Sequence, residues 1–391
     1  MNKRPKNPNI LTLKESRAII KSNLREMKRL EKKKREKLTP EQFQSVMKSA
    51  DNIIEIEDLE TCFFTDSGVV RSVNKISFDV PKNSVVGLVG ESGCGKSVTS
   101  LSIMQLVQAP QGQVVGGEIR FNAEDLGTNE NGEKLCYEIT RMPTLDMCRI
   151  RGKDISMIFQ EPMTSLNPVF TVGYQIEEVF YLHNPEATKE EARKKAIEML
   201  TMVGIPMPET MVDYYPHQLS GGMRQRVMIA IALTGNPKLI IADEPTTALD
   251  VTIQSQILKL LQRVQKDCGA SILLITHDLG VVAEMADYVV VMYAGKIVEK
   301  GTVYEIFDNP LHPYTVGIQK AKPSLASDAA EELYSIPGNV PNPINIPDEC
   351  LFKGRCGKKC GKCAGKYPKE IKVSETHSVF CHLYDEEGGD K

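Results

Sequence analysis

The sequence lacks any long apolar run. None of its 391 residues lies in an apolar stretch that approaches the roughly 18 residues needed to cross a bilayer. The first residues, Met-Asn-Lys-Arg-Pro-Lys, also lack the apolar core of a secretory signal peptide. We therefore expect a cytosolic protein, and in that compartment disulfides are rare.

The sequence also has little net charge, −3 at pH 7, but the charge is unevenly spread. Residues 1–50 contain fifteen Lys or Arg and five Glu. Within residues 15–37, apolar side chains recur at helical spacing from Ile20 to Leu30, which predicts a basic, weakly amphipathic helix. Such a helix can contact an anionic membrane surface or a partner, or it can be a solvated arm. Thr39 then begins a second capped segment.

Residues 90–97 read Gly-Glu-Ser-Gly-Cys-Gly-Lys-Ser and fit the phosphate-binding pattern G-x-x-x-x-G-K-S/T. The apolar run 84–89 before them predicts a buried strand, and residues 97–106 predict a helix. Backbone N–H groups at such a helix start bind phosphate, with Lys96 on the β- and γ-phosphates and Ser97 on Mg²⁺. The predicted nucleotide contacts of this loop are Gly90, Ser92, Gly93, Cys94, Gly95, Lys96, Ser97 and Val98.

Three more predicted strands end in polar side chains. They end at Gln160, at Asp243 with Glu244, and at His277. Because parallel strands share one carboxyl edge, we expect these groups to lie in one site with the phosphate loop. Glu244 would polarise the attacking water, and His277 and Gln160 would contact it or the γ-phosphate. The predicted Mg²⁺ ligands are Ser97, Gln160 and Asp243.

A second anion-binding site is predicted at the start of another helix. Residues 219–226 read Leu-Ser-Gly-Gly-Met-Arg-Gln-Arg, and an apolar helical run follows them. Segments 54–59 and 73–80 predict strands of a small antiparallel sheet, in which Phe63 could stack on a base or belong to the core. The further nucleotide contacts predicted are Phe63, Ser220, Gly221, Gly222 and Asp250.

The order of these motifs resembles the ATP-binding-cassette (ABC) family. Residues 90–97 resemble its Walker A motif, Leu-Ser-Gly-Gly-Met its signature, and Leu-Ile-Ile-Ala-Asp-Glu-Pro its Walker B motif. Gln160 resembles the Q-loop glutamine and His277 the switch histidine. The resemblance covers roughly residues 51–305. It implies an α/β P-loop NTPase core with an antiparallel β subdomain and a helical subdomain, which binds ATP and Mg²⁺.

A narrower resemblance is to the oligopeptide/dipeptide importer ATPases, and segments 158–168, 215–230 and 309–315 carry it. Met223 resembles the D-type subunit, because the F-type partner usually has Gln there. The resemblance implies pairing with an F-type subunit under two permeases, at the cytoplasmic face of the membrane, with an extracytoplasmic solute-binding protein. The loop after Gln160 and the helical region beyond it would contact the permeases. The basic arm and the polar stretch 127–145 depart from the pattern.

Five of the ten cysteines lie near the end of the chain, in a segment rich in Pro and Gly. We expect residues 306–391 to form a small module that builds no core of its own and folds with the help of a metal. Four thiolates suit a [4Fe-4S] cluster or Zn²⁺, and free thiols are the third alternative. The importer family is associated with an iron–sulfur cluster. Its spacing matches Cys350, Cys356, Cys363 and Cys381, and leaves Cys360 spare.

The expected function is ATP-driven uptake of di- or oligopeptides. An importer ATPase for another solute such as nickel chelates, an ABC ATPase that acts on nucleic acid, and a regulator that binds ATP without turnover are the alternatives. The basic arm lacks interleaved aromatics, which disfavours nucleic acid as a partner, and intact Glu244 and His277 disfavour the regulator. We divide the chain into an extension (1–50), a nucleotide-binding domain (51–305) and a C-terminal module (306–391).

Overall fold

The structure is a computed structural model, and it describes residues 11–123, 125–247, 249–321 and 334–385. Parts of the predicted extension (1–10) and of the predicted C-terminal module (322–333 and 386–391) lie outside these ranges. None of the helices described within them is long and apolar enough to cross a membrane.

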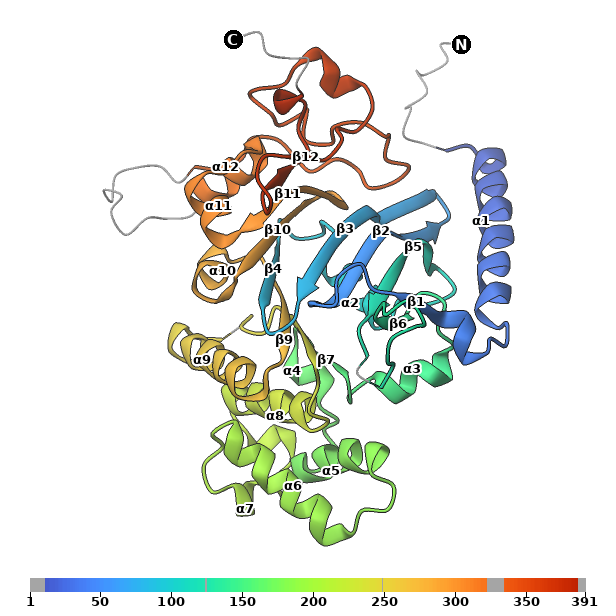
Figure 1. Cartoon of the computed structure of the whole chain (residues 1–391). Coiled ribbons are helices and arrows are strands. Elements are labelled where there is room, and N and C mark those ends of the chain that lie inside the picture. The colour runs from blue at the N-terminus through green and yellow to red at the C-terminus, as the bar shows by residue number, and fades with distance from the viewer. Residues whose placement is uncertain (1–10, 124, 248, 322–333, 386–391) are drawn as a thin grey trace, which may run out of the picture.

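The described residues form two sheets, and the larger has the strand order β12-β13-β11-β10-β4-β9-β8-β7 (Figure 1). Its five consecutive strands from β10 to β7 are parallel and almost entirely buried, as expected for a sheet covered on both faces. They are β10 (Tyr288–Tyr293), β4 (Val85–Val89), β9 (Ser271–Thr276), β8 (Leu239–Asp243) and β7 (Ile155–Ile158). The predicted buried strands are thus confirmed, and their carboxyl ends lie along one edge.

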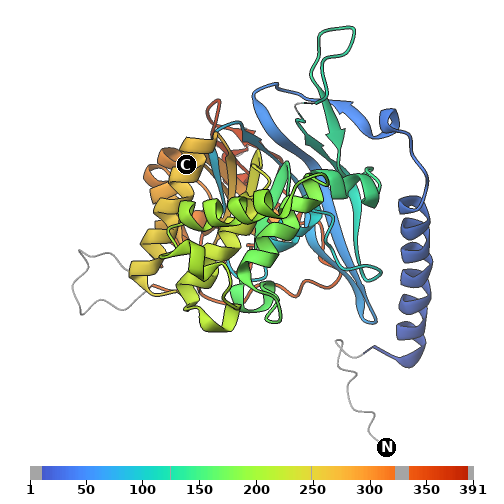
Figure 2. The ribbon, with the colours of Figure 1, turned by 90° about the horizontal axis from the view of Figure 1, so that it is seen from below.

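Helices cover this sheet and extend from it. Helices that pack on it include α2 (Lys96–Ile103), α8 (Gly221–Leu233), α9 (Val251–Cys268) and α10 (Leu279–Met285). The helical region at the bottom of Figure 1, which Figure 2 shows from below, contains α5 (Val172–His183), α6 (Lys189–Met202) and α7 (Pro208–Met211). A capping box at Thr188 starts α6. The predicted loop after Gln160 contains one helical turn, α4 (Pro162–Ser165).

The second sheet is antiparallel, with the order β1-β6-β5-β2-β3. Its strands are β1 (Gln44–Val46), β2 (Asn52–Thr65), β3 (Gly68–Pro81), β5 (Gly112–Phe121) and β6 (Leu135–Glu138). The polar stretch 127–145 contains the strand β6, which pairs with both β1 and β5. The short helix α3 (Thr144–Ile150) follows. A boundary at residue 50 would separate β1 from the sheet that it completes.

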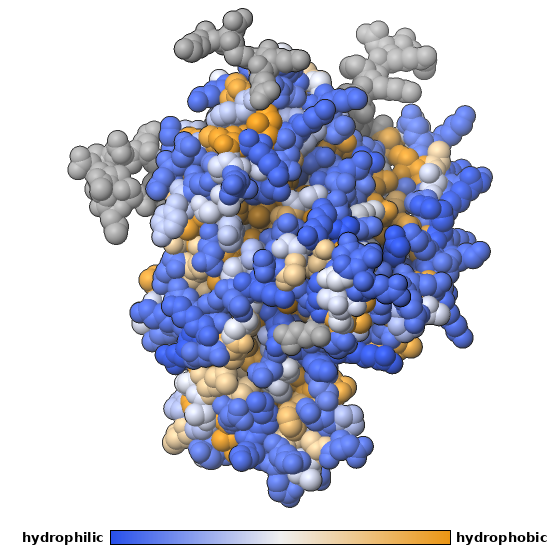
Figure 3. Space-filling view, viewed as in Figure 1, coloured by the Kyte–Doolittle hydropathy of each residue, from blue (hydrophilic) through white to orange (hydrophobic). Residues whose placement is uncertain are grey.

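The predicted basic helix is α1 (Leu13–Lys34), and it packs along the second sheet (Figures 1 and 2). Leu30 is buried against Cys62 and Phe64, and the Asn23 side chain donates a 2.9 Å hydrogen bond to the Thr65 carbonyl. Because this inner face packs on the sheet, α1 is not a fully solvated arm. The outer face carries exposed Lys and Arg and is largely hydrophilic in Figure 3.

The C-terminal segment extends the larger sheet. Strands β12 (Ile371–Lys372) and β13 (Ser378–Val379) add to β11 (Lys296–Thr302), and α11 (Val303–Asp308) and α12 (Pro313–Lys320) precede them. Leu351 and Phe352 are buried in the same apolar cluster as residues of β4 and β9. The few apolar side chains of this segment therefore pack into the core of the nucleotide-binding domain.

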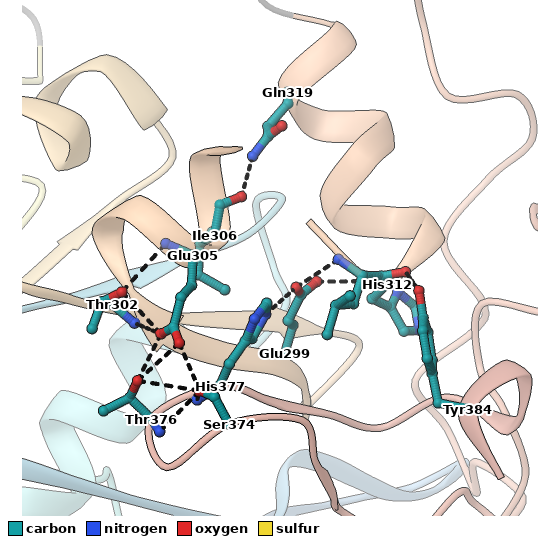
Figure 4. Close-up of polar contacts among 11 residues, drawn as sticks. Glu299, Thr302, Glu305, Ile306, His312, Gln319, Ser374, Thr376, His377 and Tyr384 are labelled. Carbon is teal, nitrogen blue, oxygen red and sulfur yellow. Dashed lines mark hydrogen bonds and ion pairs between the residues drawn. The ribbon is translucent and has the colours of Figure 1, made fainter. Parts of the chain in front are cut away.

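Two glutamates attach the C-terminal segment to the domain (Figure 4). Glu299 on β11 is completely buried and accepts hydrogen bonds from the Leu311 amide (2.7 Å), the His312 amide (2.8 Å) and His377 Nε2 (2.8 Å). Glu305 on α11 accepts hydrogen bonds from the hydroxyls of Ser374 and Thr376. A buried carboxylate needs such partners, and they come from both sides of the junction.

Candidate nucleotide-binding and hydrolysis site

The glycine loop joins β4 to α2 and packs closely against its neighbours. Gly90 and Gly95 have φ values of 154° and 105°. A Cβ atom would lie 2.2 Å from the Met292 carbonyl oxygen at Gly90 and 2.1 Å from the Ser72 carbonyl oxygen at Gly95. Both positions therefore require glycine. Beside Gly93 nothing lies within 4 Å of that position, so this side of the loop is open to a ligand.

Lys96 lies inside the loop at the first turn of α2. Its side chain is 5% exposed, and Nζ donates hydrogen bonds to the carbonyls of Gly90 (2.8 Å) and Glu91 (3.1 Å). Cys94 is buried beneath the loop, and burial raises the pKa of its thiol. The ammonium group and the positive end of the helix therefore coincide where phosphates would bind.

Ser97 and Asp243 come together behind the loop. Ser97 Oγ donates to Asp243 Oδ1 at 3.0 Å, and Ser100 Oγ donates to Oδ2 at 3.4 Å. Burial raises the pKa of Asp243, and the Ser97 hydrogen bond opposes that rise. Hydroxyl and carboxylate oxygens are the ligands that Mg²⁺ prefers, so this pair fits the ion. Gln160, the third predicted ligand, donates to Glu244 instead.

Glu244 is the centre of a second polar group at the same edge. Its Oε1 lies 3.1 Å from His277 Nδ1, and its Oε2 accepts hydrogen bonds from Gln160 Nε2 (2.9 Å) and Thr247 Oγ1 (2.8 Å). Burial raises the pKa of Glu244, but the hydrogen bonds from His277 and Thr247 outweigh it and hold the pKa below its ordinary value. The carboxylate therefore stays ionised.

Thr247 is a member of this polar group that the sequence analysis did not identify. It follows Glu244 by three residues, and its amide donates to the Glu244 carbonyl at 3.2 Å, so a local turn brings its hydroxyl back to the carboxylate. Ser and Thr side chains commonly make such local contacts. The Glu-Pro-Thr-Thr sequence was the available signal.

The signature residues lie at the start of α8. Ser220 Oγ accepts a 3.3 Å hydrogen bond from the Met223 amide. At Gly222 a Cβ atom would lie 2.9 Å from Ile253 of α9, and α9 is capped by Asp250. In the described part of the chain, neither Ser220 nor Asp250 hydrogen-bonds to the glycine loop. Both are exposed.

Phe63 lies on the opposite face of β2 from the buried Phe64. Phe64 packs with Leu30 of α1, whereas Thr61 Oγ1, two residues before Phe63, hydrogen-bonds to Ser102 Oγ of α2 at 2.8 Å. The Phe63 ring borders Gly112 and is only partly buried. It therefore lies on the face of the strand that looks towards the helix of the glycine loop.

The C-terminal cysteines differ in burial. Cys350, Cys363 and Cys381 are buried and Cys356 is partly buried, whereas Cys360 is exposed, with its sulfur 3.5 Å from that of Cys363. Burial, together with neighbouring thiols of the set, raises the pKa of Cys350 to about 11 and that of Cys381 to about 12. Among the described residues, no three His, Cys, Asp or Glu side chains are placed to hold a metal ion.

A glycine loop on a central parallel strand, a buried Asp243 beside Ser97, and Glu244 between Gln160 and His277 define an ABC ATPase. The ABC transporter family model matches residues 73–247. The ADP- and phosphate-bound cassette MJ0796 superposes with a TM-score of 0.53 at 25% identity, over 64% of this chain and 98% of that one. For cbiO1 of Clostridium perfringens the TM-score is 0.52 at 28% identity, over 66% and 92%.

A second family model, the C-terminal region of oligopeptide/dipeptide transporters, matches residues 298–363. The oligopeptide transport ATP-binding protein AppD of Bacillus subtilis (strain 168) is 49% identical over 87% of this chain and 99% of its own length. The dipeptide transport ATP-binding protein DppD of Escherichia coli (strain K12) is 44% identical over 86% and 98%. The chain belongs to the oligopeptide/dipeptide importer family of ABC ATPases, as a D-type subunit.

Proposed function

We propose that this chain binds and hydrolyses ATP to drive the uptake of di- or oligopeptides through an ABC importer. The observation that carries the proposal is the position of Glu244, ionised, between Gln160 and His277 at the edge where the glycine loop lies. The names of the relatives support peptides as the solute. We assign the nucleotide chemistry to residues 51–305, and supporting roles to 1–50 and 306–391.

Each residue of the site then has a task in phosphoryl transfer. Lys96 leaves the carbonyls of Gly90 and Glu91 and binds the β- and γ-phosphates. Ser97 and Asp243 would hold Mg²⁺, and the ion would neutralise charge on those phosphates. Glu244 accepts a hydrogen bond from the attacking water and polarises it. His277 contacts the γ-phosphate, and Thr247 and Gln160 keep the carboxylate oriented.

We propose that a second, F-type ATPase completes each site. Ser220, Gly221 and Gly222 are exposed or partly exposed at the start of α8, and Asp250 is exposed at the start of α9, so both can face a partner. Helix N-termini bind anions, so the signature of one subunit suits the γ-phosphate held by the other. Phe63 would stack on the adenine.

The permeases would bind the helical region, which places the chain peripherally at the cytoplasmic face of the membrane. Leu182 is 70% exposed and Val169 is 69% exposed in this region. Leu182 lines an open groove between α5 and α6 with Tyr174, Tyr181 and Arg193. Glu161 and the α4 turn connect this region to Gln160, so permease contact would reach the hydrolysis site.

We propose further that Cys350, Cys356, Cys363 and Cys381 bind a [4Fe-4S] cluster, with Zn²⁺ as the alternative. Three of the four are buried and the fourth is partly buried, whereas Cys360 is exposed. Ligation by four side chains would add folding free energy to a segment with few apolar residues. Anaerobic purification of the five Cys→Ser variants, with iron, sulfide and zinc analysis, tests the assignment. Only Cys360→Ser should keep a brown chromophore, and a colourless wild type with one zinc would reject the cluster.

Reconstitution tests the function as a whole. The chain is co-expressed with an F-type subunit, two permeases and a solute-binding protein, and ATP hydrolysis in proteoliposomes is measured with peptides or nickel chelates as the solute. We expect stimulation by peptides. If nickel chelates stimulate ATP hydrolysis and peptides do not, the transported solute is a nickel chelate and not a peptide. Stable association with nucleic acid, and none with permeases, would contradict the proposal.

A further inference from the structure

The side chain of Glu91, the second residue of the glycine loop, binds the C-terminal module. Arg355 holds both of its carboxylate oxygens, with Nη1 2.7 Å from Oε2 and Nη2 3.0 Å from Oε1. The two residues lie 264 positions apart in the sequence. Bidentate pairing of a guanidinium with a carboxylate is strong and fixes the relative orientation of the two groups.

Arg355 is itself fixed in place, so it acts as a rigid clamp. Its side chain is only 8% exposed. Nε donates to the Pro337 carbonyl at 3.1 Å and Nη2 donates to the Ile336 carbonyl at 3.3 Å. The guanidinium also lies 5.8 Å from the centre of the Tyr293 ring. The carbonyls orient the cation, and Glu91 is the carboxylate that neutralises it.

The backbone of Glu91 also contacts the C-terminal segment. Its amide donates a 2.8 Å hydrogen bond to the hydroxyl of Tyr314, which is fully buried. The Tyr314 ring packs against Tyr293 and Phe352, with ring centroids 4.7 and 5.5 Å away. The carbonyl of Glu91 accepts from Lys96. One loop residue therefore joins the phosphate-binding lysine to the aromatic cluster and to Arg355.

The module that carries Arg355 is attached to the larger sheet by several hydrogen bonds. Glu299 and Glu305 fasten it to β11 and α11 through the contacts in Figure 4. The Tyr367 hydroxyl donates a 2.9 Å hydrogen bond to the Ile297 carbonyl of the same strand. Arg355 thus connects the glycine loop to a module that is itself hydrogen-bonded to β11 and α11.

We propose that Arg355 is a positioning residue through which the C-terminal module controls the affinity of the glycine loop for ATP. The proposal rests on the nucleotide site described above. Arg355 neutralises the carboxylate of Glu91 and keeps it turned away from the position of the phosphates. When this pairing is lost, an unpaired negative charge is free to face the polyphosphate and repel it.

Two substitutions separate this charge effect from a structural one. Arg355→Met removes the guanidinium and leaves the Glu91 carboxylate without its paired cation. We expect Mg·ATP to bind the full chain about tenfold more weakly, which corresponds to about 1.4 kcal/mol. The loss should shrink at high salt, because salt screens exposed charges. The double variant Arg355→Met with Glu91→Gln also lacks the unpaired carboxylate, so most of the affinity for Mg·ATP should return.

The controls use residues of the same module and the same loop. Lys353→Met removes a cation two residues from Arg355 that pairs with Glu349 inside the module, and it should leave the affinity unchanged. Arg355→Lys keeps the charge but cannot make the bidentate contact, so its affinity should fall between those of wild type and Arg355→Met. Thermal unfolding of each variant reports separately on folding.

Titration of the purified full-length proteins with a fluorescent ATP analogue and Mg²⁺ measures these affinities. Equal affinity in wild type and Arg355→Met would overturn the proposal. So would equal weakness of Arg355→Met with and without Glu91→Gln, because Arg355 would then only help the module to fold. If Lys96→Ala binds ATP as well as wild type does, the proposed nucleotide site fails, and the coupling fails with it.

Discussion

Two Glu–His pairs, one in the hydrolysis site and one at the C-terminal junction, use the same chemistry in opposite surroundings. His277 is 61% exposed beside Glu244, and the two side chains lie 3.1 Å apart. His377 is 3% exposed beside a fully buried Glu299, at 2.8 Å. The exposed pair is open to a substrate, whereas the buried pair is closed by the surrounding backbone amides. Surroundings therefore decide whether such a pair suits turnover or holds the fold together.

The partners of each glutamate explain this contrast. Glu244 is bound by side chains of Gln160, Thr247 and His277, which can rearrange around a water molecule. Glu299 accepts two backbone amides, and those cannot leave without moving the chain. We expect changes at the first pair to alter rates and changes at the second to alter stability.

The largest expected effect is that of Glu244→Gln. The amide cannot polarise water as the carboxylate does, and loss of such a group typically slows a reaction about 10²- to 10⁴-fold. ATP binding should persist, because the glycine loop is intact. Steady-state ATP hydrolysis by the assembled transporter measures the effect. If Glu244→Gln turns over ATP nearly as fast as wild type, Glu244 does not take part in hydrolysis. The contrast between the Glu244–His277 and Glu299–His377 pairs would then be wrong.

Glu299→Ala should act on stability instead. It leaves the amides of Leu311 and His312 and the His377 ring without their acceptor in the interior. Breaking a buried pair of this kind typically costs about 3–5 kcal/mol. Urea denaturation measures the loss. Glu299→Gln, which keeps the volume and one acceptor oxygen, should lose less, and equal stability of Glu299→Ala and wild type would contradict the anchoring role.

Glu305 makes the junction sensitive to acid. Burial raises its pKa, but hydrogen bonds from Ser374, Thr302 and Thr376 outweigh it and lower the pKa to about 2 from the ordinary 4.5. The lower pKa in the folded state means that its contribution to stability is present above pH 4.5 and is lost as the pH falls towards 2. The stability difference between wild type and Glu305→Gln should narrow over that window. The exposed Glu284→Gln serves as control, and a difference independent of pH would reject the assignment.

Deletion of residues 1–37 should have the smallest effect on the site. ATP affinity should stay unchanged, since the glycine loop and the Glu244 group lie after Phe63. If the exposed face of α1 binds anionic lipid, liposome binding should weaken by about 1 kcal/mol for each Lys or Arg near the surface. That loss should shrink at high salt. Equal liposome binding with and without α1 would assign the helix to packing alone.

The sequence predicted the hydrolysis site better than the junction, and the reason is physical. Gln160, Asp243, Glu244 and His277 follow apolar strands directly, so local pattern and the shared edge of a parallel sheet bring them together. Arg355 carries no such signal, because its partner Glu91 is 264 residues away. The strand β6 escaped prediction for the same reason, since it spans four residues and pairs with β1 from a distant segment.

Alanine substitution at both histidines tests the comparison most directly. For His277→Ala and His377→Ala, ATP turnover by the assembled transporter and the free energy of unfolding are measured side by side. We predict that His277→Ala loses turnover and keeps stability, whereas His377→Ala loses stability and keeps turnover per folded molecule. Loss of turnover in folded His377→Ala, together with normal turnover in His277→Ala, would contradict the account.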